Sequence, residues 1–171
     1  RAFAGAPVSA DDASTVWFNP AGMTSLPASE VEAAVHVIMP QTELTNDGSR
    51  KFNGATFVPT ADNSKQSPYS PTPIPNAFGV LLDKERGFAL GVGMTAPFGM
   101  ANEYSESWFG RFDSIKTDLK TYNYSLVGAY DVNRFITIGG GVDYQIADVT
   151  LTSMKNNSGT ELHSTLEGND N

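Results

Sequence analysis

The sequence of 171 residues contains no cysteine, which excludes disulfides, thiolate metal sites and cysteine nucleophiles. Histidine occurs only at His36 and His163, without a partner at HxH or HxxxH spacing, so we expect no metal and no cofactor. No run approaches the roughly 18 consecutive apolar residues of a transmembrane helix. Basic residues are scarce as well, because 11 Lys and Arg stand against 19 Asp and Glu, a net charge of −8. This balance repels phosphate and excludes nucleic acid as a partner.

What the chain does contain is a repeated alternation of apolar with small or polar residues, the period of two that is typical of β-strands. The alternation predicts five strands, at residues 31–39, 77–82, 88–96, 122–130 and 136–146. Two short charged turns separate some of them, at 83–87 and 131–134, and two long loops separate others, at 41–75 and 97–116. The polar remainder, Ser153–Asn171, is interpreted as the beginning of a third long loop.

Long and short connections alternate along the chain, which is expected for antiparallel strands with all long loops at one end. Strands of about ten residues with one apolar face are typical of outer-membrane barrels. A soluble β-sandwich, whose strands are usually shorter, is the alternative. The predicted fold class is all-β, a transmembrane antiparallel up-and-down β-barrel. Because such a barrel needs an even number of strands, at least about 8, residues 30–171 are interpreted as its first part, truncated before a sixth strand.

The first 29 residues have a different character, with many small residues and two short helical signals. Asn19 followed by Pro20 is a favourable start for a helical turn, since Asn caps helices and Pro suits their first position. Pro27 ends that turn. Segments this short are not stable alone. We therefore expect residues 1–29 to pack on or inside the barrel as a hatch.

Several ordered blocks of sequence resemble one known family. They are residues 10–13 (ADDA), 19–23 (NPAGM), 110–112 (GRF), 115–123 (IKTDLKTYN) and 139–145 (GGGVDYQ). Together they resemble the N-terminal portion of the FadL/TodX family, outer-membrane transporters of long-chain fatty acids and aromatic hydrocarbons. Each block alone is weakly specific, whereas the ordered set, with its spacing along nearly the whole chain, is strongly specific.

The resemblance implies a monomeric barrel of about fourteen strands in the bacterial outer membrane, surrounded by lipid and lipopolysaccharide and plugged by the hatch. It also implies a channel, not an enzyme. A hydrophobic small molecule is caught between outer loops, passes to an internal pocket and leaves sideways through a gap in the wall. In some relatives a basic residue at the position of Ile146 meets the ligand carboxylate. Its absence here leaves room for a neutral hydrocarbon ligand.

Two sets of candidate residues follow from this comparison. Asn19, Pro20 and Ala21 are candidates for the moving part of the hatch, and a static helix cap is the alternative. Gly93, Pro97 and Gly99 are candidates for a lateral opening, because Pro removes a ladder donor and Gly has no side chain to fill the wall. The alternative for this second set is an ordinary strand end.

Apolar side chains are also concentrated in the second long loop. The candidates for a ligand-access surface there are Phe98, Met100, Trp108, Phe109 and Phe112. Exposed apolar groups on a loop are unfavourable unless they bind something or pack together. Packing within the loop and contact with lipopolysaccharide are therefore the alternatives.

Two other functions compete with transport. One is a structural or adhesive outer-membrane barrel without transport activity, and the other is a barrel enzyme that acts on lipids. The hatch favours transport, because an adhesive barrel does not need one. The two isolated histidines disfavour the enzyme, because nothing in their spacing supports a Ser-His-Asp arrangement.

Overall fold

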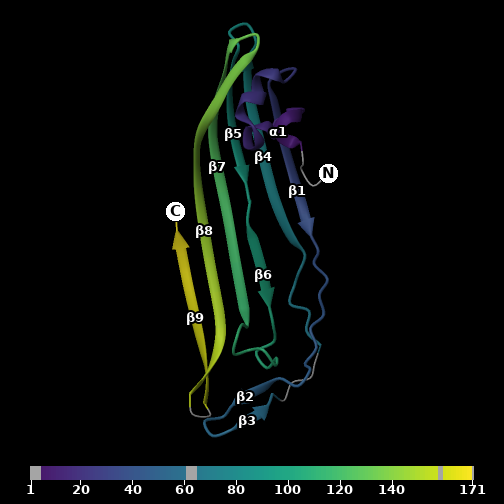
Figure 1. The fold of residues 1–171 in the computed structure, drawn as a ribbon, viewed down its shortest axis with the longest axis vertical. Coiled ribbons are helices and arrows are strands. Elements are labelled where there is room, and N and C mark those ends of the chain that lie inside the picture. Colours follow the sequence, from purple (N-terminus) through teal and green to yellow (C-terminus); the bar gives the residue numbers. More distant parts are fainter. Residues whose placement is uncertain (1–4, 61–64, 158–159, 171) are drawn as a thin grey trace.

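The computed structural model describes residues 5–60, 65–157 and 160–170, so residues 1–4 of the predicted hatch lie outside the described residues. Three short helical segments precede the strands: α1 Ala6–Ser9, α2 Thr15–Phe18 and the 3₁₀ turn η1 Pro20–Ser25 (Figure 1). The strands are β1 Glu30–Ile38, β2 Arg50–Phe52, β3 Phe57–Pro59, β4 Thr72–Asp83, β5 Phe88–Thr95, β6 Gly99–Glu103, β7 Lys116–Asn133, β8 Ile136–Asn157 and β9 Thr160–Asp170. None of the described helices has the length and apolar character to cross a membrane.

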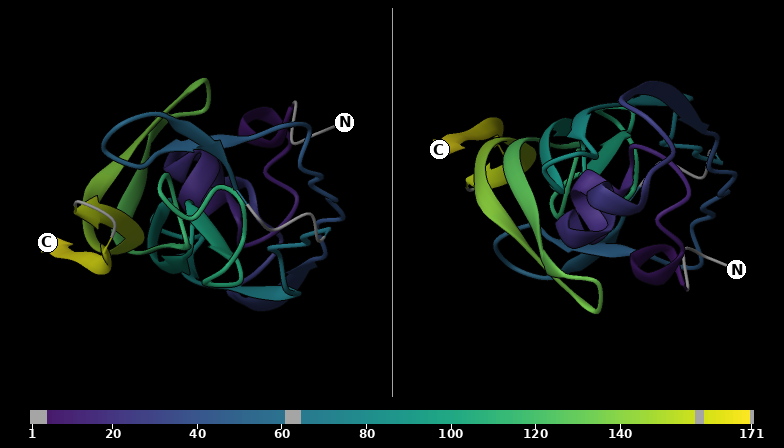
Figure 2. Two further views of the ribbon diagram at one scale, coloured as in Figure 1. Left: turned by 90° about the horizontal axis from the view of Figure 1, so that it is seen from below. Right: turned by 90° about the horizontal axis from the view of Figure 1, so that it is seen from above.

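Seven strands form one antiparallel sheet in the order β1-β4-β5-β7-β8-β9, and β6 pairs with β7 beside this path. Strands β2 and β3 form a separate hairpin within the first long loop. Figure 2 shows that the sheet curves around the helical segments. The five predicted strands are confirmed as β1, β4, β5, β7 and β8. Their antiparallel, sequentially connected arrangement is the one that the alternating loop lengths predict.

The interpretation of Ser153–Asn171 as a loop is wrong. Strand β8 continues to Asn157, and β9 pairs back along it from Thr160 to Asp170. A sixth strand is therefore present, and the expectation that the chain ends before it is corrected. Polar residues form this hairpin because a strand that does not face an apolar layer needs only its backbone ladder and cross-strand pairs.

The predicted loops also contain strand at their edges. Strand β4 begins at Thr72, inside the predicted loop 41–75, and it includes Pro73 and Pro75. Strand β6 lies inside the predicted loop 97–116. The prolines indicated a loop, but a strand tolerates proline where it lacks a neighbour on one side.

The two faces of the sheet differ as the alternation predicts. On β7, Val127 and Ala129 are 6% and 3% exposed, whereas the flanking Leu126 and Tyr130 are 51% and 50% exposed. The buried set faces the helical segments, and the exposed set forms the outer face. On β8 the outer apolar residues run from Ile136 to Tyr144, which spans about 27 Å at roughly 3.4 Å per residue. This matches the apolar band of about 25 Å on outer-membrane barrels.

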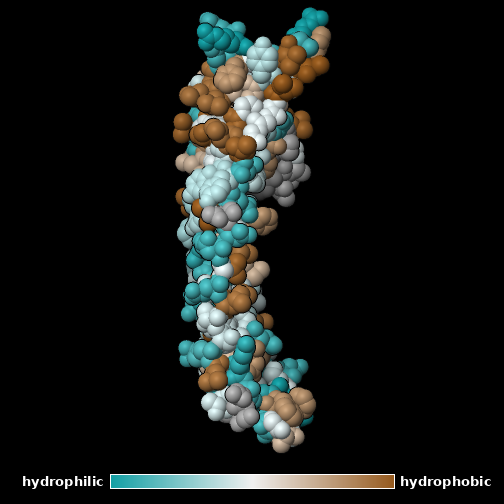
Figure 3. Space-filling model, turned by 90° about the vertical axis from the view of Figure 1, so that its left-hand side faces the viewer, coloured by the Kyte–Doolittle hydropathy of each residue, from teal (hydrophilic) through white to brown (hydrophobic). Residues whose placement is uncertain are grey.

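Beyond this band the outer face becomes polar. On β8 the same face continues through Asp148, Thr150 and Thr152 towards the long loops. Figure 3 shows apolar side chains gathered towards the end of the molecule that carries the hatch, and hydrophilic ones along most of the other half. The long strands therefore carry their loops well beyond the apolar band.

The core of the described chain lies between the hatch and the inner face of the sheet. Its buried members are Ala13, Val16, Met23 and Leu26 from the hatch and Val80, Ala89, Val127 and Ala129 from the sheet. Burying a Val, Leu or Met side chain contributes about 1.5–3 kcal/mol. Packing against the sheet, rather than helix propensity, therefore holds these short segments in place.

Candidate functional site

The hatch fits the sheet because two strands carry glycine where it makes contact. A Cβ on Gly91 would lie 2.5 Å from Met23 Sδ and 2.7 Å from Val16 Cγ2. A Cβ on Gly139 would lie 2.4 Å from the backbone nitrogen of Ala21. Both distances are shorter than real Cβ contacts, so any side chain at these two positions would push the hatch away from the wall.

A hydrogen-bonded group also fixes the hatch at the end of the sheet that carries the short turns. Thr24 Oγ1 donates to Asp131 Oδ1 over 2.8 Å, and Thr137 Oγ1 donates to the same oxygen over 2.6 Å. Asp131 and Thr137 face each other on β7 and β8. One carboxylate therefore ties η1 to two neighbouring strands.

The candidate hatch residues Asn19, Pro20 and Ala21 lie at the centre of this contact. Asn19 occupies the N-cap position of η1 in an extended conformation, as predicted, but its side chain does not cap the turn. Its backbone carbonyl instead accepts hydrogen bonds from Gly22 N–H and from Thr15 Oγ1, both over 2.8 Å. Pro20 and Ala21 lie directly over Gly139 of the wall.

The hydrogen-bonded pairing of the wall is interrupted beside β4. Pairing of β4 with β5 ends at Ala77 and Met94, although β4 continues to Thr72 along β1. Strand β6 begins at Gly99 and pairs with β7 instead. Within the described chain, residues 72–76 of β4 therefore have a strand neighbour on one side only.

The candidate opening residues lie at or next to this gap. Pro97 belongs to the segment between β5 and β6, and Gly99 is the first residue of β6. Gly93 lies one pair before the end of the β4–β5 ladder, opposite Phe78, and a Cβ there would lie 3.1 Å from Val16 of the hatch. Gly93 thus lies beneath the hatch, whereas Pro97 lines the first of two cavities beside the unpaired stretch of β4 and Gly99 lines the second.

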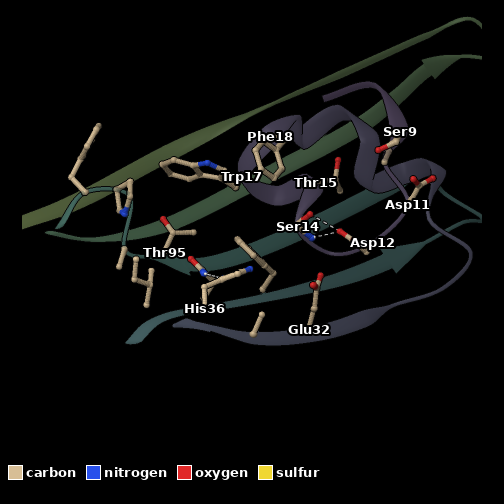
Figure 4. Close-up of a pocket in the computed structure, with 18 of the residues that line it drawn as sticks. Ser9, Asp11, Asp12, Ser14, Thr15, Trp17, Phe18, Glu32, His36 and Thr95 are labelled. Atoms are coloured by element: carbon tan, nitrogen blue, oxygen red, sulfur yellow. Dashed lines mark hydrogen bonds between the residues drawn. The ribbon is translucent and has the colours of Figure 1, made fainter. Parts of the chain in front are cut away.

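The two cavities meet beside this unpaired stretch of β4. The first, of about 840 Å³, lies between the hatch and strands β1, β4 and β5 (Figure 4). The second, of about 380 Å³, lies between β4, β6 and β7. Ile38, Ile74, Ala96 and Phe98 line both cavities. Each volume taken singly is within the range of roughly 300–1,000 Å³ for pockets that hold small organic ligands.

The first cavity combines an apolar lining with a few polar groups. Trp17, Phe18, Ile74 and Phe78 supply much of the apolar surface. The polar groups come from both sides: Asp11, Asp12 and Ser14 from the hatch, and Glu32, His36 and Thr95 from the strands (Figure 4). Asn76 also lines the cavity and is hydrogen-bonded to His36. No Lys or Arg is among the described residues that line this cavity. Nor do the described residues contain a group of three or more His, Asp or Glu side chains placed to hold a metal ion.

Comparison with known proteins assigns the family. The family described as outer membrane protein transport protein (OMPP1/FadL/TodX) matches residues 1–171. The chain belongs to this family. It is 29% identical over 149 residues to outer membrane protein P1 of Haemophilus influenzae strain Rd, which covers 84% of this chain and 32% of that protein. It is 30% identical over 146 residues to a long-chain fatty acid transport protein of Escherichia coli O6:H1, which covers 84% of this chain and 30% of that protein.

The structural comparison shows the same fold. A crystal structure of a Pseudomonas aeruginosa FadL homologue matches with a TM-score of 0.80 at 18% identity, over 99% of this chain and 44% of that chain. The predicted fold class and the outer-membrane location are thereby confirmed. The chain spans about a third of the length of the two named relatives.

In this OMPP1/FadL/TodX chain, the predicted ligand-access residues are placed in two groups. Phe98 and Met100 are 64% and 54% exposed beside the second cavity. Trp108 is only 7% exposed, its ring stacks on Tyr104 with centroids 3.8 Å apart, and its Nε1 donates to the Ser114 carbonyl. Phe109 and Phe112 are half-buried around it. The first group lies at the second cavity, and the second group lines a separate cavity of about 850 Å³ between the loop and the β2–β3 hairpin.

A charged cluster joins three outer segments of this family member. Arg111 donates from Nε to Glu161 Oε2 over 3.0 Å and from Nη2 to Glu161 Oε1 over 2.9 Å, which is a two-point bond. Lys51 Nζ donates to the same carboxylate over 2.6 Å. These two cations lower the pKa of Glu161 from its ordinary value of 4.5 to about 2. The cluster lies at the loop end of the sheet, well beyond the apolar band, and ties the β2–β3 hairpin to the second long loop and to β9.

The position of Ile146 does not suit a ligand clamp. Ile146 lies on the same face as Tyr144, the outer face, and pairs with Tyr122 of β7. A basic residue there would therefore not point into the interior at this register. Ile146 itself therefore does not line the interior of this chain.

Sequence reasoning missed several residues that line the cavities. Ile38 was expected only as part of a strand, Ile74 fell in a predicted loop, and Thr95 was one of several small residues on β5. The Pro-x-Pro pattern at Pro73 and Pro75 could have indicated the unpaired part of β4, because prolines within a β-strand suit an edge without a neighbour.

Proposed function

We propose that this chain supplies the hatch and the first part of the wall, residues 1–29 and 30–171, of an outer-membrane channel for hydrophobic small molecules. The observation that carries the proposal is the meeting of two mostly apolar cavities at an unpaired stretch of the wall, directly beside the hatch. Long-chain fatty acids and aromatic or aliphatic hydrocarbons are the ligand classes that suit such a lining.

The route follows from the arrangement of these parts. A ligand lands near Phe98 and Met100, enters the second cavity and passes Ala96 into the first. The unpaired side of β4 then offers a way out through the wall without breaking a ladder of hydrogen bonds. Movement of the hatch about Asn19, Pro20 and Ala21 would enlarge the first cavity, because α2 and the loop before it form one of its sides.

The proposal includes a closed barrel. Strands β1 and β9 each have one neighbour within the described chain, and lipid cannot satisfy the free backbone groups of an open edge. We therefore propose that further strands close the wall, giving a monomeric barrel whose apolar band contacts lipid and whose outer loops contact lipopolysaccharide. Its role is transport, without a catalytic step.

Ala96 offers the sharpest test because it lines both cavities and has a small side chain. In the complete barrel protein that contains this chain, Ala96→Phe should fill the junction and strongly lower uptake of labelled oleate and toluene. The matched control is Ala33→Phe, the same change at an exposed position on the outer face of β1. Uptake is compared in cells with equal surface amounts of each variant. Equal uptake by both variants would contradict the proposed route and favour a barrel without transport activity.

A further inference from the structure

Three buried side-chain oxygens lack a hydrogen-bond partner within the described chain. They are Glu32 Oε2, Thr95 Oγ1 and Asp118 Oδ1. Glu32 and Thr95 line the first cavity, and Asp118 lines the second. Buried polar groups are normally paired, so unpaired ones call for an explanation. All three residues line the cavities, and the other carboxylate oxygen of Asp118 accepts a hydrogen bond from Lys120 Nζ over 2.8 Å.

The chemistry of these atoms selects one kind of ligand. Carboxylate oxygens only accept hydrogen bonds, and a threonine hydroxyl both donates and accepts. The first cavity also contains the carboxyl groups of Asp11 and Asp12, with no Lys or Arg among its described lining residues. A carboxylate anion would be repelled there and would lack a cation. A ligand with an uncharged hydroxyl group would meet acceptors for its proton.

Thr95 is the best placed of the three groups. It is the last residue of β5, where the β4–β5 ladder has already ended, and it precedes Ala96 at the junction of the cavities. Thr95 is 5% exposed, and Figure 4 shows it on the strand side of the cavity, across from the hatch residues. Threonine has more than one staggered χ1 rotamer, so the covered hydroxyl can turn towards an arriving partner without backbone movement.

We propose that Thr95 is a specificity-determining residue, whose hydroxyl binds the uncharged hydroxyl end of an otherwise apolar ligand, an alcohol or a phenol. The assignment rests on the proposed transport function and refines its ligand class. It gives the cavity a preference that its apolar lining cannot supply, because apolar surface does not distinguish an alcohol from an alkane of equal length. Asp11, Asp12 and Glu32 add the complementary exclusion of anions.

The test uses the complete barrel protein and three probes of equal chain length: 1-dodecanol, n-dodecane and dodecanoate at pH 8. The wild type should bind dodecanol more tightly than dodecanoate. Thr95→Val keeps the shape and removes the hydroxyl, so it should weaken dodecanol binding by about twofold to tenfold. Dodecane binding should stay unchanged, which also shows that the variant is folded. Thr95→Ser, which retains a hydroxyl, should keep most of the preference for dodecanol.

The outcomes separate this assignment from the proposed function. If Thr95→Val binds both dodecanol and dodecane as tightly as the wild type does, the role of Thr95 alone is overturned. Equal weakening of both probes would also overturn it, because it would indicate a role in cavity shape. Tighter wild-type binding of dodecanoate than of dodecanol would refute the exclusion of anions. Failure of the wild type to bind any probe would overturn the proposed function and this assignment together.

Discussion

Replacing Gly139 with alanine should loosen the hatch without disturbing the barrel. The added Cβ would lie 2.4 Å from the Ala21 nitrogen and 2.8 Å from its Cα, whereas ordinary contacts begin at 3.4 Å. The hatch must therefore retreat by about 1 Å, since 3.4 minus 2.4 is 1.0. The nearest atoms all belong to the backbone of Pro20 and Ala21, so no side-chain rotation can relieve the contact.

The energetic cost follows from this geometry. Forcing a methyl group into a packed contact costs about 1–3 kcal/mol. The entropy that alanine removes from an unfolded chain does not offset this cost, because the wall is folded whether the hatch is docked or released. The released population should therefore rise by about 5-fold to 150-fold.

A thiol placed under the hatch measures that population. The chain has no cysteine, so Met23→Cys introduces the only one it contains, at a position that is 0% exposed. When the hatch closes faster than the reagent reacts, the rate of maleimide labelling is proportional to the released population. The control is Gly140→Ala on the neighbouring residue, where an added Cβ meets nothing within 4 Å. Equal labelling rates in the Gly139→Ala and Gly140→Ala backgrounds would refute the reasoning.

Two further predictions concern the opening and the outer loops. Replacing Pro97 and Gly99 with valine should lower uptake of oleate and toluene in cells with equal surface amounts of each variant. The change adds a backbone donor and two branched side chains at the proposed opening. Unchanged uptake would exclude Pro97 and Gly99 from the route. The second concerns pH. The pKa of Glu161 is lowered from 4.5 to about 2 in the folded protein, so its stabilisation of the loops is present above about pH 4.5 and is lost as pH falls towards 2. The ¹⁹F signal of 5-fluorotryptophan at Trp108 should follow this transition. Glu161→Gln should abolish the transition, and Arg111→Lys should move the transition to higher pH because lysine cannot form the two-point bond. A transition that persists in Glu161→Gln would refute the assignment.

The strands of the apolar band could be predicted because lipid and a packed interior impose a strict alternation on them. Strand β9 could not be predicted, because Thr160–Asp170 contacts neither lipid nor a packed interior and its residues do not alternate between apolar and polar. The beginning of β4 was obscured by Pro73 and Pro75, which are tolerated there only because β5 turns away. The absence of a neighbour is a tertiary property, and sequence alone does not display it.

The candidate site shows the same division. The predicted alternation places the small residues of β5 on one face, and Ala89 and Gly91 of that face are buried beneath the hatch. That Gly139 receives Ala21 could not be foreseen, because these residues are 118 positions apart and each is compatible with many partners. The burial of Trp108 depends likewise on its stacking with Tyr104 and on the shape of the loop around both.

The cluster around Glu161 also sets an order of events during assembly. Its hydrogen bonds join residues 50 positions apart, to Arg111, and 110 positions apart, to Lys51. Loops of that length lose conformational entropy before any contact compensates for it, so such contacts form late. Glu161 lies on β9 and pairs with Asn156 of β8, so we expect it to reach both cations after the β8–β9 hairpin has formed. We therefore expect the outer segments to take their final arrangement after the neighbouring wall is built.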